Sequence, residues 1–444
     1  MADKRQPPKY KLNLYLNNQN ADINDSIVEL GKELGLKRIK QKNALKLLLF
    51  NLFYSREEKI AVPRAKTSLA PRRYNPHNVG YSALRTVLDV LSQYGYIEQD
   101  IGRRVFSDNL NITTTIQSTL KLLEFFQKNC WHYSESWSYK KAPELVLLRS
   151  NTKNKKLIDY TDTAKSNWLR EELTQYNELL ADSELFLVKE DKKTGEQDII
   201  DFYEDLILAR KFIQHNTSQS EIETTYGGRM FAPWCNISSK QRKMITINGE
   251  RTIELDLEAS SINMIYVMQT GKKYPLGDSY ELSVNGLKVP RNIVKQATTI
   301  MFNTSNIQGA VAALEEHYLP NVFNDNRSKK VIKKAEEYKR IKLTIKPGDI
   351  VRGILDKHSV IKDYFLQGKK MGDYISCLES DRVFEIVRRF TKRGIPVLTV
   401  YDSFIIQEQY KDELQELMNE LPPLNYNNEN DDENTHYWGL LSNT

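Results

Sequence analysis

The segment RTIELDLEASSINMIYVM at 251–268 changes from the periodicity of a strand to that of a helix within a few residues. In its first part, apolar residues alternate with acidic ones: Ile253, Leu255 and Leu257 with Glu254, Asp256 and Glu258. This alternation predicts a half-buried strand, and from about Ser260 the apolar residues recur at helical spacing. Asp256 therefore ends a strand that runs directly into a helix. It either holds a divalent metal there or belongs to a solvent-facing acidic edge.

A second acidic residue lies in PVLTVYDSFIIQE, at 396–408. Two apolar runs, 397–400 and 404–406, flank the polar stretch Tyr401-Asp402-Ser403. Apolar runs joined by so few polar residues predict two buried strands and a tight turn. Asp402 then stands at the tip of a hairpin, where it either serves the turn alone or faces a ligand.

Two cations share one face of the helix predicted for VPRNIVKQATTIMFN, at 289–303. Pro290 suits the first turn of a helix. Arg291 and Lys295 are four residues apart and therefore lie on the same side, where like charges mildly destabilise the helix. The pair is either an ordinary surface feature or a clamp for an anion such as a triphosphate.

A glycine pair precedes an arginine in YGGRMFAPWCNISSKQR, at 226–242. Gly227 and Gly228 allow the backbone to approach a partner closely. Arg229 can reach a backbone phosphate or a base edge.

Taken in chain order, these segments resemble the motifs of the right-handed polymerases, most closely those of family A DNA polymerases and of the single-subunit RNA polymerases of phages and mitochondria. The strand-Asp, the helix with Arg-x3-Lys and the hairpin-Asp resemble motifs A, B and C. GRMFA (228–232) resembles the Gly-Arg segment ahead of motif A. YDSF (401–404) is more similar to the His-Asp-Ser-Phe of the RNA polymerases than to the His-Asp-Glu of the DNA polymerases.

The resemblance implies an α+β fold with a palm built on an antiparallel sheet and helical fingers. It also implies template-directed transfer of nucleotides from nucleoside triphosphates. Asp256 and Asp402 would bind two Mg²⁺ (or Mn²⁺) ions. Arg291 and Lys295 would hold the triphosphate, with Lys295 also a candidate proton donor to pyrophosphate. Arg229 would contact the nucleic acid, either a primer–template or a single strand.

Nucleotide selection follows the family less closely. Ser261 occupies the fifth position after Asp256, where family A DNA polymerases have a glutamate that blocks the 2′-hydroxyl, so its small size predicts that ribonucleotides can enter. Tyr401 stands where histidine is usual. The motif B helix ends in Asn303-Thr304 in place of Tyr-Gly, which makes Asn303 a candidate nucleotide-binding residue. Glu379 is a candidate supporting carboxylate.

The chain is predicted to have three regions. Residues 1–116 contain an amphipathic helix over 40–54, a second helix with Leu84, Val87, Leu88 and Leu91 on one side, a short strand, a Gly-Arg-Arg turn and another strand. This order indicates either a winged helix, with Arg103 and Arg104 in its nucleic-acid-binding wing, or a helical packing module. Residues 117–225 are predicted to be helical and thumb-like, with helices over 117–128, 163–183 and 201–217. Residues 226–444 would form palm and fingers, with the fingers at about 285–350.

A basic run at 327–346 lies between motifs B and C. It predicts a helix whose cations follow a nucleic-acid backbone, among them Lys330, Lys333 and Lys334. The net charge of +6 is a mild bias that does not by itself indicate nucleic acid.

Composition excludes several other classes of protein. Three widely separated cysteines argue against disulfides and structural zinc. The first residues form no apolar signal segment, and no stretch approaches the roughly 18 apolar residues of a membrane span. These features predict a cytoplasmic protein that binds no membrane. Two alternative functions stay open: an untemplated nucleotidyltransferase, and a non-catalytic nucleic-acid-binding replication or regulatory protein with a degenerate palm.

Overall fold

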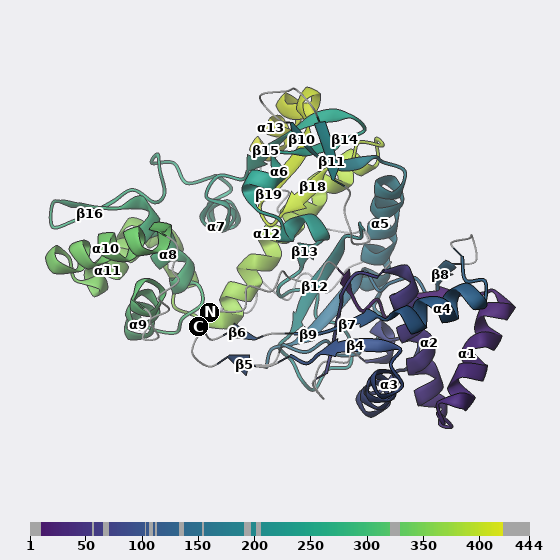
Figure 1. The fold of residues 1–444 in the computed structure, drawn as a ribbon. Coiled ribbons are helices and arrows are strands. Elements are labelled where there is room, and N and C mark those ends of the chain that lie inside the picture. The colour runs from purple at the N-terminus through teal and green to yellow at the C-terminus, as the bar shows by residue number, and fades with distance from the viewer. Residues whose placement is uncertain are drawn as a thin grey trace. The chain divides into compact units, whose positions relative to one another are not determined.

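The structure of the chain is a computed structural model (Figure 1). It describes residues 10–55, 57–64, 71–102, 104–105, 110–111, 113–132, 137–152, 155–190, 197–200, 206–319 and 329–420. The chain divides into two compact units, of which unit 1 is Met1–Gly249 and unit 2 begins at Glu250. The boundary lies just ahead of the strand that carries Asp256. Residues 226–249, which the sequence grouped with the palm, thus belong to unit 1.

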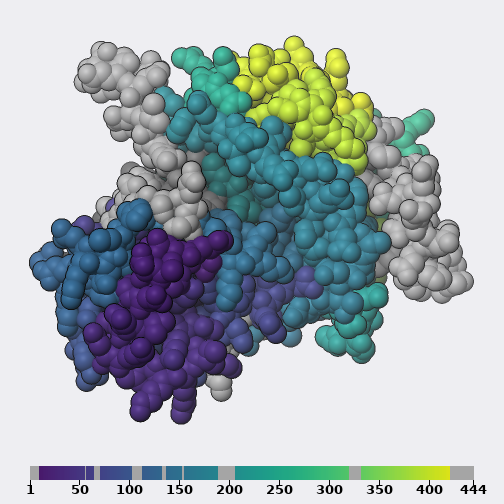
Figure 2. All heavy atoms as spheres, turned by 90° about the vertical axis from the view of Figure 1, so that its right-hand side faces the viewer, coloured from purple at the N-terminus to yellow at the C-terminus, as the bar shows by residue number. Residues whose placement is uncertain are grey.

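The first part of unit 1 combines three helices with a small sheet. Its elements are β1 (Tyr10–Lys11), β2 (Leu16–Asn18), α1 (Ala21–Glu33), α2 (Ile39–Tyr54), β3 (Ile60–Val62), η1 (Arg72–Tyr74), α3 (Tyr81–Gln93), β4 (Ile97–Asp100), β5 (Arg104–Val105), β6 (Leu110–Asn111), β7 (Thr114–Ser118), α4 (Leu120–Lys128) and β8 (Trp137–Tyr139). The sheet has the order β1-β3-β7-β4, and β7 is antiparallel to both β3 and β4. Helix α1 lies on the surface of this unit (purple in Figure 2).

The two helices predicted here are present, but one is buried more completely than expected. The apolar positions predicted for the second helix, on α3, are all buried: Leu84, Val87, Leu88 and Leu91. Gly95 follows the helix with φ +74°, which glycine adopts without strain. By contrast, α2 is not amphipathic along its length, because every residue from Leu47 to Leu52 is buried. It contacts α1 as well as α3, so more than one side of it is covered.

From α3 to β7 the order of elements is helix, strand, hairpin and strand, which is the pattern from which a winged helix is predicted. Strands β5 and β6 lie between β4 and β7 in the chain and pair with each other. Arg104 begins β5, whereas Arg103 lies outside the described residues. The function of this hairpin stays a prediction.

The second part of unit 1 is a mixture of helix and sheet. Its elements are β9 (Val146–Ser150), α5 (Ala164–Ala181), β10 (Leu185–Glu190), β11 (Gln197–Ile200), β12 (Ala209–Gln214), β13 (Arg229–Phe231), η2 (Pro233–Asn236), α6 (Ser239–Arg242) and β14 (Ile245–Ile247). One sheet has the order β13-β12-β9 and lies beside α5 (Figure 1). Strand β10 pairs with β11 and β14, antiparallel to both.

The prediction that 117–225 is mainly helical was therefore wrong. Helices α4 and α5 are present, but the helix expected over 201–217 is replaced, in its described part, by the strand β12. The apolar residues there fit both periods, and pairing with β9 and β13 decides for the strand.

Unit 2 contains antiparallel strands and a group of helices around a separate core. Its elements are β15 (Glu250–Asp256), α7 (Ser260–Thr270), β16 (Leu282–Val284), β17 (Leu287–Val289), α8 (Arg291–Met301), α9 (Ile307–Tyr318), α10 (Lys329–Thr344), α11 (Pro347–Lys357), η3 (Ser359–Tyr364), α12 (Lys369–Thr391), β18 (Leu398–Val400), β19 (Ser403–Gln407), η4 (Glu408–Tyr410) and α13 (Lys411–Asn419). Helices α7, α8, α9 and α11, with the β16–β17 hairpin, bury one continuous apolar cluster. The fold is thus mixed α/β with several antiparallel sheets.

Across the described ranges, no helix is both long and apolar enough to cross a membrane.

A buried carboxylate holds the first part of unit 1 to the second. Glu144, whose side chain is 3% exposed, accepts from Arg73 at 3.1 Å and from Arg170 at 3.0 Å. Arg73 also bonds Asp159, and its guanidinium lies 3.8 Å from the ring centre of Tyr160. Because a buried charge is tolerated only when it is paired, these contacts depend on one another.

We expect Glu144→Gln to lower the free energy of unfolding by about 3 kcal/mol, because it leaves two guanidinium groups without their shared buried partner. Urea unfolding followed by circular dichroism measures this loss. The control is Glu171→Gln, an exposed position on α5 next to Arg170, which should change stability by less than about 0.5 kcal/mol. Equal effects of the two substitutions would contradict the proposed role of Glu144.

Candidate active site

The two aspartates predicted as metal ligands lie on neighbouring strands of unit 2. Strand β15 pairs with β19 in antiparallel register, which puts Asp256 opposite Ser403. The next residue, Leu257, donates its backbone N–H to the carbonyl oxygen of Asp402 at 3.0 Å. Adjacent strands are about 4.8 Å apart, so the pairing brings the two aspartates close together in space.

The environment of Asp256 differs from that of Asp402. Asp256 is exposed at the end of β15, and Ser403 Oγ donates a hydrogen bond to its carboxylate. Asp402 is half-buried in the two-residue turn between β18 and β19. The hairpin predicted from the sequence is confirmed, and both of its strands are completely buried. Its buried strands leave the carboxylates at the end of the sheet.

Two residues at this edge have left-handed backbone conformations without being glycine. Tyr401 has φ +60° and is 48% exposed. Ala259, between β15 and α7, has φ +44°. Such conformations cost about 1–2 kcal/mol for residues with a Cβ and occur often at functional sites. The strained residues thus lie in the turn that contains Asp402 and in the turn that follows Asp256.

Ser261 does not face open space. Its hydroxyl donates to Glu379 Oε1 at 2.8 Å, so a carboxylate from α12 lies beside the first turn of α7. Sequence reasoning named both residues separately but gave no reason to place them together, because 118 positions separate them.

Tyr280 lies beside the two predicted cations of α8, and the sequence analysis did not identify it. It is 5% exposed, with Arg291 at 5.1 Å and Lys295 at 6.0 Å from its ring centre. Burial, together with the nearby carboxylates of Glu379 and Asp402, raises the pKa of Tyr280 to about 12 against the opposing effect of Arg291. Its hydroxyl therefore keeps its proton and responds to the charges of both the helix α8 and the sheet. Nothing in its local sequence, a loop after Gly277, indicates this position.

The two cations of α8 have different partners. Arg291 forms an ion pair with Asp278, with Nε 2.6 Å from Oδ2, and this pair is largely exposed. The Arg291 guanidinium lowers the pKa of the Asp278 carboxyl. Within the described chain, no carboxylate forms an ion pair with Lys295. An exposed pair contributes about 0–1 kcal/mol, so a more highly charged anion could displace Asp278.

Asn303 lies where α8 meets α12. Its side chain donates to Thr299 O at 2.9 Å and packs so closely on Gly372 that a Cβ at position 372 would collide with it. Gly372 therefore allows the close approach of the two helices. The nucleotide-binding role of Asn303 stays a prediction.

The predicted nucleic-acid contacts are distributed over both units. Lys333 and Lys334 are exposed on α10, and Lys330 lies in the first turn of the same helix. Helix α10 is attached to α9 by stacking of Tyr338 on Tyr318, with ring centres 4.7 Å apart. Arg229 is exposed on β13 of unit 1.

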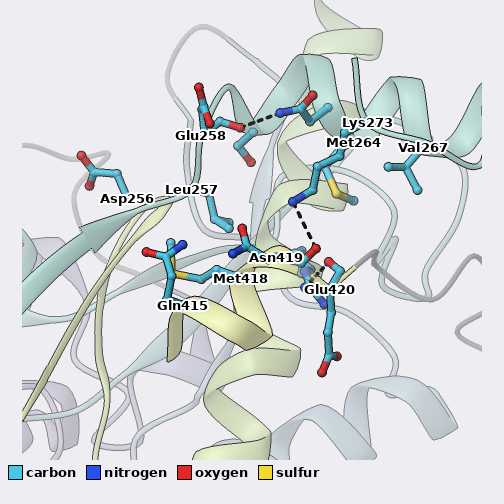
Figure 3. A pocket seen from close by; sticks show the side chains of 13 residues that line it. Asp256, Leu257, Glu258, Met264, Val267, Lys273, Gln415, Met418, Asn419 and Glu420 are labelled. Atoms are coloured by element: carbon cyan, nitrogen blue, oxygen red, sulfur yellow. Dashed lines mark hydrogen bonds between the residues drawn. The ribbon is translucent and has the colours of Figure 1, made fainter. Parts of the chain in front are cut away.

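A small cavity lies behind the β15–α7 turn. It is lined by Asp256, Leu257 and Glu258 together with residues from α7, α12 and α13. It measures about 120 Å³, whereas pockets for ligands are usually about 300–1,000 Å³. Lys273 points toward the end of α13 and donates to Asn419 O at 3.2 Å, while the Asp256 carboxylate points away from the other labelled residues (Figure 3). The cavity is therefore too small for a nucleoside triphosphate.

Among the described residues, no group of three or more His, Cys, Asp and Glu side chains is arranged to hold a metal ion. The two aspartates nevertheless fit Mg²⁺ chemically. This ion prefers hard oxygen ligands and is often held by only one or two carboxylates together with waters and substrate phosphates.

No family model, curated protein or solved structure matches the chain. The functional interpretation therefore depends on the residues and geometry described above.

A buried histidine supports the loop that carries Tyr280. His358 is 1% exposed, and its ring nitrogens lie 3.0 Å from Ser279 O and 3.2 Å from Tyr266 Oη. Burial, opposed by the Ser279 contact and assisted by Lys357, lowers its pKa from 6.5 to about 4. The folded state therefore requires the neutral ring.

Because the folded pKa lies below the unfolded value, the unfolded chain binds the proton first as pH falls. The stability from neutral His358 is complete above pH 6.5 and decreases as the pH is lowered toward 4, by at most about 1.4 kcal/mol per pH unit. Urea unfolding at pH 7, 6 and 5 measures this slope, and His358→Gln should reduce it. His77 is buried with the same shift and keeps part of the slope. The control is His132→Gln at an exposed position, which should leave the slope unchanged. A slope unaffected by His358→Gln would refute the assignment.

Proposed function

We propose that unit 2 is the catalytic part of a template-directed nucleotidyltransferase. It would join nucleoside triphosphates to the 3′ end of a nucleic-acid strand. The observation that carries this proposal is the pairing of β15 with β19, which brings Asp256 next to Asp402 at one edge of the sheet. Two-metal phosphoryl transfer needs charge neutralisation and alignment of the reacting groups. Two neighbouring aspartates, one at the end of a strand and one in a turn, suit this chemistry.

Asp256 and Asp402 are the residues that would hold Mg²⁺. When bound, the metal supplies charge neutralisation and activation of the attacking 3′-hydroxyl. The exposure of Asp256 leaves room for substrate oxygens beside it. The hydrogen bond from Ser403 would orient its carboxylate, as partners of ligating carboxylates commonly do.

The cations of α8 would bind the triphosphate. Lys295 has no described carboxylate partner and can bind phosphate directly. Arg291 would exchange Asp278 for phosphate, a stronger bidentate partner. The ring of Tyr280 would hold both cations near the reaction, because cation–π contacts are attractive at such distances. Lys295 remains the candidate proton donor to pyrophosphate.

Sugar selection would depend on Ser261 together with Glu379. The small Ser261 would let ribonucleotides enter. The adjacent Glu379 carboxylate is now a further group that can contact the sugar. Incorporation from ribonucleotide and deoxyribonucleotide pools, measured in parallel, tests it, and strict use of deoxyribonucleotides would refute it.

We expect Asp256→Asn and Asp402→Asn each to reduce nucleotide incorporation by at least about 10³-fold, because the asparagine amide cannot replace an ionised metal ligand. The assay contains Mg²⁺, labelled nucleotides and a primer–template. Glu250→Gln, a carboxylate at the exposed start of the same strand, should retain activity.

Circular dichroism establishes that each variant folds. Incorporation without a template would favour the untemplated enzyme. Nucleic-acid binding without any incorporation by the wild type would favour the non-catalytic alternative.

A further inference from the structure

Three cations lie on one face of the β13-β12-β9 sheet in unit 1. Lys211 of β12 is directly opposite Arg229 of β13 in the antiparallel pair. Arg149 of β9 is the partner of Ile213, two residues further along β12. Paired residues, and residues two apart on a strand, point to the same side of a sheet. Arg149, Lys211 and Arg229, with Phe231, therefore share one face, called the basic sheet face below.

The basic sheet face is the less buried side of this sheet. Lys211, Arg149 and Phe231 are half-buried and Arg229 is exposed. The residues that alternate with them face the interior and are buried: Val146, Leu148, Arg210, Phe212 and Met230. The alternation follows the pleat of the strands, so the cations lie on the less buried side of this sheet, where Ile213, which packs against Gly227, is buried.

Two of the charges on this face, those of Arg149 and Lys211, are not balanced by a described carboxylate. Neither Arg149 nor Lys211 forms an ion pair with a described carboxylate. Burial lowers the pKa of Lys211, and the nearby Arg149 lowers it further. The two cations thus oppose one another in a partly desolvated place, an arrangement that an anion would relieve.

Two features position the cations in advance. The Lys211 ammonium lies 4.1 Å from the ring centre of Phe231, which holds it by a cation–π contact. Gly227, with φ +80°, packs against Ile213 so tightly that a Cβ would lie 2.8 Å from Ile213 Cγ1. Only glycine fits there, and it leads the chain into β13 and to Arg229.

We propose that the basic sheet face binds the phosphate backbone of a nucleic-acid strand. Three adjacent strands place the cations in an arc on the order of 10 Å across, which suits successive phosphates. The planar guanidinium groups of Arg149 and Arg229 match phosphate oxygens bidentately. The proposal rests on the proposed function for the choice of nucleic acid over an acidic peptide, and it gives the substrate strand a binding place on unit 1.

The test is binding of fluorescent single-stranded and duplex oligonucleotides to the full chain, without Mg²⁺ or nucleotides. We expect Arg149→Gln combined with Lys211→Gln to weaken binding at least ten-fold at low salt. Each lost phosphate contact should reduce the slope of log K against log salt by about 0.7 for a single strand and about 0.9 for a duplex. The two probes distinguish which form is bound.

The matched control is Lys32→Gln combined with Lys37→Gln. It removes two positive charges from exposed positions, Lys32 in the last turn of α1 and Lys37 in the segment that follows it. Its binding should stay within two-fold of wild type. Equal losses in both double variants, or an unchanged salt slope in the first, would overturn the proposal. Competition by polyglutamate as effective as by oligonucleotide would assign the face to acidic peptides instead.

This experiment separates the inference from the proposed function. If the basic sheet face does not bind nucleic acid but the proposed function is correct, Arg149→Gln/Lys211→Gln leaves binding intact, while Asp402→Asn still abolishes incorporation. If the face binds nucleic acid but the proposed function is incorrect, the double variant loses binding and the wild type shows no nucleotide incorporation.

Discussion

The backbone pairing of β15 with β19 is the constraint on which the candidate active site depends. It puts Asp256 opposite Ser403 and Leu257 beside Asp402. A slip of one residue would turn every side chain of β15 to the other face of the sheet. The apolar residues of β19, all buried, resist such a slip, so burial of the strand positions the carboxylates at its end.

A second set of contacts positions the groups that face this edge. His358 holds Ser279, the neighbour of Tyr280, and Tyr280 lies against the two cations of α8. Tyr280 also responds to the charges of Glu379 and Asp402. Tyr280 thus contacts α8 and lies within electrostatic range of carboxylates on α12 and in the hairpin. The proposed chemistry needs these groups near one another, because the phosphate clamp and the metal ligands must act on the same substrate.

Much of the local structure followed from the sequence. The change of period after Asp256, the hairpin around Asp402 and the helix from Arg291 are all present. The clearest error is 201–217, where a helix was expected and β12 was found. Its apolar residues fit either period, and only the pairing with β9 and β13 distinguishes them. Similarly, α2 was expected to have a polar side, but its neighbours cover most of it.

The sequence by itself determined the elements that carry Asp256, Asp402, Arg291 and Lys295, because periodicity and turn chemistry are local properties. Tertiary structure alone decided which distant residues join them. Tyr280, the Ser261–Glu379 hydrogen bond and the neighbouring Arg149 and Lys211 come from segments with no local signal of proximity. Such contacts arise from strand register and from the packing of helices around a core, and neither can be read from spacing along the chain.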